Sequence, residues 1–103
     1  MAQEVVWTLP ASRDLEHIIQ FIAKDSRHYA EEFLIEAQLI ASRLIPFPRR
    51  GRKVPELGDS SIREVFLSSY RLIYQVANSR ILILALVHGS RDLFALWRRE
   101  KRT

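Results

Sequence analysis

Residues 62–88, with the sequence IREVFLSSYRLIYQVANSRILILALVH, decide the fold of this chain. Three segments within it are rich in Ile, Leu, Val, Phe and Tyr, namely 62–67, 70–76 and 80–88. Such residues favour strands, and the short polar break at 77–79 is typical of a hairpin turn. We therefore expect three antiparallel strands, with the continuous apolar run 81–87 as the most buried part.

The middle segment alternates between two faces, as a strand with both faces in use would. One face carries Tyr70, Leu72, Tyr74 and Val76, and the other carries Arg71, Ile73 and Gln75. A long cation in mid-strand either serves a site or pairs with a carboxylate. For Arg71, the structural alternative is an ion pair with Glu64 on the neighbouring strand.

The chain before this stretch predicts a short strand and two helices. Residues 5–7 form the strand, and Pro10 suits the first turn of the helix that follows. Asp25-Ser26 supplies a break and an N-cap for the second helix, which runs down to Pro46. The apolar stripes of the two helices are Leu15, Ile18, Ile19 and Ile22, and then Tyr29, Phe33, Ala37, Ile40 and Leu44. The short break predicts an antiparallel helical hairpin.

A loop and a last short helix complete the chain. Three prolines and two glycines make 45–61 a loop, and 92–102 resembles a helix whose N-cap is Asp92. The fold class is therefore α+β in a single domain, residues 1–103. An N-terminal strand and a helical hairpin pack on one face of a small twisted antiparallel sheet, followed by a short C-terminal helix.

Composition excludes several classes of protein. Hydrophobic residues make up 48% and charged residues 27% of the chain, which is typical of a folded globular domain. The absence of cysteine excludes disulfides and thiolate chemistry.

The longest apolar run is too short to cross a membrane, and the acidic start does not resemble a signal peptide, so we expect a cytoplasmic protein. His17, His28 and His88 lack metal-ligand spacing and no glycine-rich phosphate loop is present, so we expect no metal and no cofactor.

Charge is distributed unevenly along the chain. Up to Pro46, four bases face seven acids, whereas from Phe47 onward twelve bases face five acids. Thirteen of the sixteen bases are arginine, whose planar fork suits phosphate or carboxylate. The basic half favours a polyanionic or acidic partner, with a solvated surface as the alternative. Two places within it stand out: the loop stretch 49–53 and the segment 88–92 at the end of the most buried strand.

The order and spacing of these features resemble the RelE/ParE superfamily of bacterial type II toxins, also called plasmid-stabilisation proteins, from Trp7 to about Phe94. The motifs that carry the resemblance are Asp14-Leu15 with Ile18 and Ile22, Phe47-Pro48-x-x-Gly51-Arg52, Val54-Pro55-Glu56-Leu57, Ile62-Arg63-Glu64, Tyr70-Arg71-Leu72-Ile73-Tyr74-Gln75-Val76 and His88-Gly89-x-Arg91-Asp92-Leu93. The resemblance implies a growth-inhibiting toxin, neutralised by a cognate antitoxin that is a small acidic protein. It is compatible with a homodimer or a toxin–antitoxin hetero-oligomer.

Two branches of the superfamily imply different targets. RelE-like members cleave ribosome-bound mRNA without metal, whereas ParE-like members poison DNA gyrase. Arg71 and Arg91 match the two phosphate-clamp arginines of the RelE branch. Its lysines, however, fall here on Ile62 and Glu64, and its C-terminal tyrosine falls on Trp97, so the ParE-like branch is favoured.

Other functions remain open from the sequence. A second nuclease arrangement of the superfamily corresponds to Glu56 as base, Arg71 as clamp and His88, and a further alternative is a non-toxic, degenerate binding module. The residues expected to bind the target or the antitoxin are Arg49, Arg50, Arg52, Lys53, Arg71, Arg91, Trp97, Arg98 and Arg99.

Overall fold

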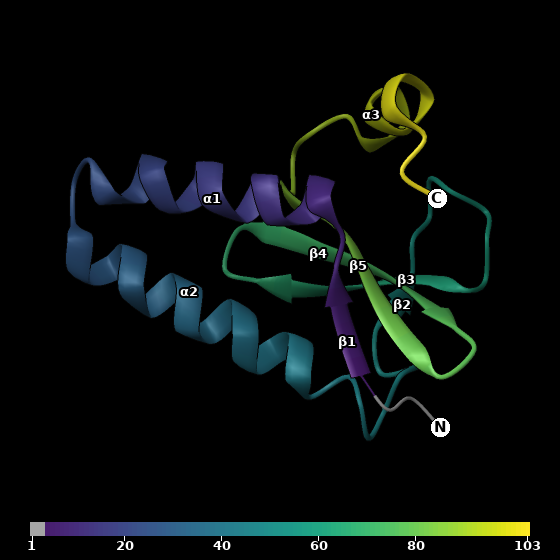
Figure 1. Cartoon of the computed structure of the whole chain (residues 1–103). Helices are drawn as coiled ribbons and strands as arrows, with labels where there is room; N and C mark the ends of the chain where they lie inside the picture. The colour runs from purple at the N-terminus through teal and green to yellow at the C-terminus, as the bar shows by residue number, and fades with distance from the viewer. Residues whose placement is uncertain (1–3) are drawn as a thin grey trace.

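Residues 4–103 are described by a computed structural model, and their strands form one five-stranded sheet with the order β1-β5-β4-β3-β2 (Figure 1). Along the chain the elements are β1 (Glu4–Trp7), α1 (Leu9–Ala23), α2 (Arg27–Ser42), β2 (Arg52–Lys53), β3 (Ile62–Leu67), β4 (Tyr70–Ala77), β5 (Arg80–His88) and α3 (Leu93–Glu100). The α+β class and the order of its main elements are as expected from the sequence.

The three central antiparallel strands are as expected, whereas the two edge strands of the sheet differ from the expectation. Strands β3, β4 and β5 pair antiparallel, and Asn78 takes the positive φ that a tight hairpin turn requires. Strand β1 runs parallel to β5, from Glu4 opposite Arg80 to Trp7 opposite Ile83, so the sheet is mixed rather than wholly antiparallel. The two residues of β2 pair with β3 inside the stretch expected to be all loop. The periodicity of a strand carries no information about the direction of its neighbour, which explains the first error, and two residues are too few to show a period at all, which explains the second.

The two helices form the expected hairpin, whose N-caps are Thr8 and Ser26. The stripe of α2 differs in one position, because Tyr29 is 64% exposed and Ala30 is buried in its place. Figure 1 shows the connection between α1 and α2 lying away from the strands, so the start of α2 has no sheet to pack against. Helix α2 ends at Ser42, four residues before the expected Pro46, and the intervening residues form turns.

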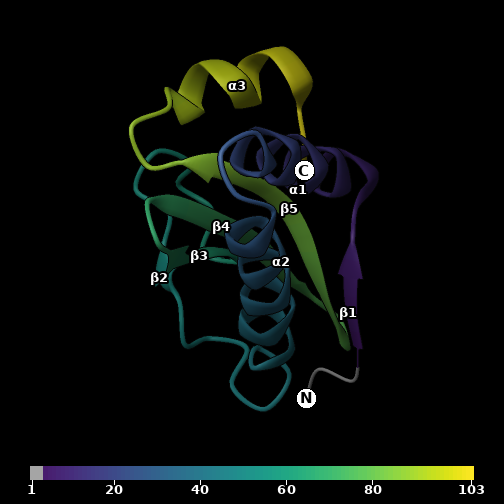
Figure 2. The same ribbon diagram turned by 90° about the vertical axis from the view of Figure 1, so that its left-hand side faces the viewer.

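Each face of the sheet has its own hydrophobic core. The helical hairpin covers one face, where Phe33, Leu44, Leu72, Tyr74 and Ile83 are buried together. Figure 2 views the molecule from that side, with α1 and α2 in front of the strands. The short helix α3 lies against the other face through Leu93 and Leu96. Because α3 has only eight residues, the second face is covered over only part of its length.

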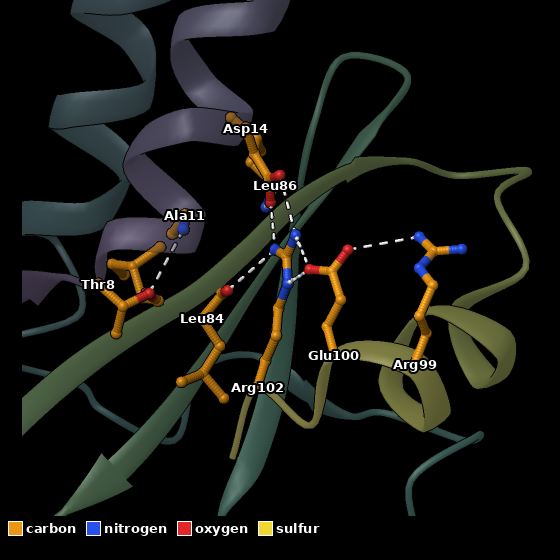
Figure 3. A network of polar contacts seen from close by, with 9 residues as sticks. Thr8, Ala11, Asp14, Leu84, Leu86, Arg99, Glu100 and Arg102 are labelled. Atoms are coloured by element: carbon orange, nitrogen blue, oxygen red, sulfur yellow. Dashed lines mark hydrogen bonds and ion pairs between the residues drawn. The ribbon is translucent and has the colours of Figure 1, made fainter.

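A β-bulge in β5 shapes the free edge of the sheet. Ile73 pairs with Ala85 and Tyr74 with Ile83, so Leu84 has no partner on β4. Strand β1 pairs with β5 only as far as Ile83. Beyond that point side chains take the place of a strand: Asp14 of α1 accepts the Leu86 N–H at 3.0 Å, and Arg102 donates to the Leu84 carbonyl at 3.2 Å (Figure 3).

The same arginine fastens the end of the chain to α1. Its guanidinium pairs with both carboxylate oxygens of Asp14 and with Glu100, and only 6% of the side chain is exposed (Figure 3). Burial opposes the charge, but the carboxylates of Asp14 and Glu100 outweigh it and raise the pKa of Arg102. The contact holds the segment after α3 against β5 and so fixes the position of α3.

Candidate functional site

Arg71 lies at the centre of an ion-pair cluster whose two inner members, Arg71 and Glu64, are buried. The cluster consists of Arg71 on β4, Glu64 on β3, Glu56 in the loop before β3 and Arg52 on β2. The Arg71 Nε donates to Glu64 at 2.5 Å, and its two terminal nitrogens donate to Glu56 at 2.7 and 2.9 Å. Arg52 donates to the other oxygen of Glu64 at 2.6 Å. The pairing of Arg71 with Glu64 that the sequence left open is confirmed, and Glu56 completes it.

Burial favours the state of this cluster in which the arginine is protonated and the carboxylates are ionised. The side chains of Arg71 and Glu64 are 6% and 0% exposed, so each charge needs its partner. The hydrogen bonds from Arg71 hold the pKa of the Glu56 carboxyl below its ordinary value of 4.5, and those from Glu56 raise the pKa of Arg71. Three of the five N–H groups of the Arg71 guanidinium, including one on each nitrogen, donate to these two carboxylates. A phosphate reaches the donors that face Glu56 only if that pair opens.

His88 lies on the opposite face of the sheet from Arg71. Residues opposite each other on paired strands share a face, and Arg71 pairs with Val87 whereas Tyr70 pairs with His88. The His88 ring packs edge-on against Tyr70, which in turn packs against Phe33 of the hairpin. Its Nδ1 contacts the Ser90 hydroxyl at 2.7 Å. The structure thus brings Glu56 and Arg71 together but not His88.

Among residues 4–103, Arg91 and the residues of α3 form no hydrogen bond with the Arg71 cluster. Arg91 is exposed in the turn before α3, and Asp92 caps the helix as expected by accepting the Ala95 N–H at 3.0 Å. Arg98 lies over the ring of Phe94, and Arg99 pairs with Glu100. Trp97 packs against the second core, and its indole nitrogen is buried with no hydrogen-bond partner among residues 4–103.

The basic loop between α2 and β3 is held firmly although its cations are exposed. The hydroxyl of Tyr74 donates to the Pro48 carbonyl at 2.8 Å and accepts the Gly51 N–H at 3.0 Å. Burial raises the pKa of Tyr74, which keeps this donor protonated. A Cβ on Gly51 would lie 2.5 Å from the Glu64 carbonyl oxygen, so only glycine permits this approach. These contacts explain the Phe47-Pro48-x-x-Gly51 spacing.

Three important residues were missed by reasoning from the sequence. Tyr74 anchors the loop, Arg63 donates to the Gly51 carbonyl at 3.0 Å, and Asp14 receives Arg102 from the far end of the chain. All three stand in motifs noted above. Their partners are 23, 12 and 88 positions away in sequence, which no local pattern specifies.

Two classes of feature are not found within residues 4–103. No group of three or more His, Asp or Glu residues there is placed to hold a metal ion. No helix in that range is long and apolar enough to span a bilayer.

Comparison with known proteins identifies the family. The model of the ParE toxin of type II toxin-antitoxin systems, parDE, matches residues 5–93. A protein named Toxin RelE2 from Caulobacter vibrioides is 34% identical over 92 residues, which cover 88% of this chain and 99% of that protein. The chain belongs to the ParE toxin family of type II toxin-antitoxin systems.

A solved structure has the same fold. It is described as the chromosomal ParDE TA system from P. aeruginosa, and the match has a TM-score of 0.59 at 21% sequence identity. It covers 85% of this chain and 96% of the other. Membership of a toxin–antitoxin family implies a cognate antitoxin as partner.

Proposed function

We propose that this protein inhibits growth by binding DNA gyrase, as the ParE-like branch does, rather than by cleaving RNA. The observation that carries the proposal is the closed Arg71 cluster, in which Glu56 and Glu64 occupy the guanidinium. A nuclease has to present free cationic donors to the phosphate in its transition state. A gyrase inhibitor needs a complementary surface, which does not depend on a free Arg71.

The position of His88 supports the same proposal. General acid–base catalysis requires an acid and a base within hydrogen-bond reach of the same reacting group. Glu56 and His88 lie on different sides of the sheet, and the pKa that Arg71 lowers makes the Glu56 carboxylate a weaker base. The arrangement therefore lacks a paired acid and base around Arg71.

The alternative is a RelE-like ribonuclease, and the name of the Caulobacter relative favours it. In that function Arg71 and Arg91 clamp the phosphate, after the ribosome or the message has opened the pair between Arg71 and Glu56. Arg91 is exposed and none of the carboxylates in residues 4–103 pairs with it, so it is available for such a contact.

We further propose that a cognate antitoxin binds the protein and neutralises it. The family match and the fold shared with a ParDE structure support this partner. Because the second half of the chain carries an excess of seven positive charges, an acidic antitoxin segment would be attracted to it.

One pair of assays separates the two targets. The same purified preparation is added to a plasmid supercoiling reaction with gyrase and to a cell-free translation reaction with mapped message ends. We expect inhibited supercoiling and intact message. Cleaved message that becomes intact with Arg91→Ala would establish the ribonuclease instead, and inactivity in both assays would indicate a binding module without toxicity.

A further inference from the structure

A groove beside the basic loop is not used by the proposed gyrase or nuclease chemistry. It consists of two adjoining hollows that share Arg49 and Val76. The larger has a volume of about 670 Å³ and is lined by Pro46, Phe47, Pro48, Arg50 and Asn78. The smaller, of about 270 Å³, is lined by Lys53, Ser60, Ser61 and Arg63. We call the two hollows together the Phe47 groove.

The groove is formed before any partner arrives. The Tyr74 hydroxyl and the Arg63 guanidinium hold Pro48 and Gly51 through three hydrogen bonds of 2.8 to 3.0 Å. The Arg50 N–H closes the turn on the Phe47 carbonyl at 3.1 Å. Because the loop is already ordered, a ligand would not have to offset the entropy of ordering it.

The larger hollow has an apolar side, formed by Phe47, its two flanking prolines and Val76, next to polar lining residues. Phe47 is 66% exposed although it is a large aromatic residue, and prolines flank it on both sides. Val76, at the end of β4, faces the same hollow. Prolines lack the backbone N–H that would recognise a polar edge, so this side suits an aliphatic or aromatic side chain.

The smaller hollow is cationic and its charges are not neutralised. Arg49, Lys53 and Arg63 line the smaller hollow, and none of them lies within 4.0 Å of a carboxylate in residues 4–103. The acid next to this hollow in sequence, Asp59, is engaged by the N–H and hydroxyl of Ser61 at 2.9 and 2.7 Å. Elsewhere on the same loop, Arg52 is paired with Glu64, so the unpaired cations gather on the groove side.

We propose that the Phe47 groove binds an acidic segment of the antitoxin that also carries a large apolar side chain. The apolar side chain packs against Phe47 between the prolines, and neighbouring carboxylates pair with Arg49, Lys53 and Arg63. This inference rests on the proposed function only in taking the antitoxin as the partner. A nucleic acid would also satisfy the cations and is the competing occupant in the experiment below, whereas an exposed Phe47 between two prolines favours an apolar side chain of a protein segment.

The test measures binding of the antitoxin candidate, a small acidic protein from an open reading frame adjacent to this gene, by calorimetry. The groove variants are Phe47→Ala and the double variant Arg49→Glu/Lys53→Glu. The control is Lys24→Glu/Arg27→Glu, which makes the same change of charge at the exposed connection between α1 and α2. Circular dichroism and thermal melting establish that all variants are folded.

We expect the double groove variant to weaken binding at least about 30-fold and Phe47→Ala about tenfold, because like charges and a lost apolar anchor each cost affinity. The control should change less than about threefold. The affinity of the unaltered protein should fall as salt rises, and this dependence should be weaker in the double groove variant.

Failure of the inference and failure of the proposed function give different results. Antitoxin that binds the groove variants as tightly as the unaltered protein overturns the groove and leaves the antitoxin as partner. Absence of binding even to the unaltered protein contradicts the proposed function itself. A labelled 20-nucleotide RNA whose binding is lost in Arg49→Glu/Lys53→Glu, while antitoxin binding is kept, assigns the groove to nucleic acid and overturns the inference.

Discussion

The Arg71 cluster and the Phe47 groove both contain arginines and lie on neighbouring parts of the sheet. Their arginines differ in that those of the cluster are paired with carboxylates and those of the groove, within the part of the chain that the structure describes, are not. In the cluster, two arginines face two glutamates, and Arg71 is 6% exposed. In the groove, Arg49, Arg50 and Lys53 are exposed without a carboxylate within 4.0 Å among residues 4–103. The buried Arg71 has to be paired, whereas the exposed cations of the groove carry no such requirement and stay available to a partner.

This difference changes which arginines are candidates for function. Arg71 is the residue that the family resemblance emphasises most, but its contacts are those of a structural centre. The loop cations, which a charge run would assign to solvent, are the ones held on a rigid support. Position in a motif therefore indicates that a residue matters, and its contacts indicate in what way.

The largest effect is expected from Arg71→Ala. It leaves the carboxylate of Glu64 buried and short of a partner, so the free energy of unfolding should fall by about 3–5 kcal/mol. Urea denaturation measures it. A double variant, Arg71→Met/Glu64→Leu, should lose less, because it removes both charges. An unchanged stability for Arg71→Ala would show that the cluster is not structural.

Gly51→Ala should have the next largest effect, because Gly51 connects the two regions. The added Cβ meets the Glu64 carbonyl oxygen at 2.5 Å and the Tyr74 hydroxyl at 2.7 Å. Relieving these contacts should cost about 1–3 kcal/mol of the free energy of unfolding and loosen the loop. Thermal melting measures the loss of stability, and amide hydrogen exchange measures the loosening of the loop. Gly58→Ala is unsuitable as a control, because Gly58 has a positive φ of 64°.

A smaller effect is expected from pH. The pKa of Glu56 is lowered in the folded state, so its contribution to stability is complete above its ordinary value of 4.5 and is lost as pH falls through the lowered value. Urea unfolding between about pH 6 and about pH 3 should therefore show a steeper loss for the unaltered protein than for Glu56→Gln. Parallel curves for the two proteins would mean that Glu56 does not contribute through its charge.

The smallest effect on stability is expected from the groove cations. Arg49→Ala and Lys53→Ala remove exposed groups without an ion pair, so each should change the free energy of unfolding by less than about 0.5 kcal/mol. Chemical denaturation of the two variants beside Arg71→Ala tests the comparison directly. A loss of several kcal/mol in either would show that the loop cations are structural as well.

Much of the architecture could be read from local patterns. The meander of β3, β4 and β5 follows from period-two alternation and a turn at Asn78, and the N-caps Ser26 and Asp92 follow from side chains that accept a backbone N–H. The direction of β1 and the pairing of β2 could not be read in this way. Alternation specifies which face a residue occupies but not which strand lies beside it.

The candidate site, like the fold, was predictable from the sequence only in part. The sequence by itself determined that a cation stands in mid-strand at Arg71, that the loop 49–53 is basic, and that the motifs are those of the ParE toxin family. Only the tertiary structure decided that Glu56 and Glu64 neutralise Arg71, that His88 faces away from it, and that Tyr74 holds the loop. The physical reason is that burial sets the cost of an unpaired charge, and burial depends on segments that meet only when the chain has folded.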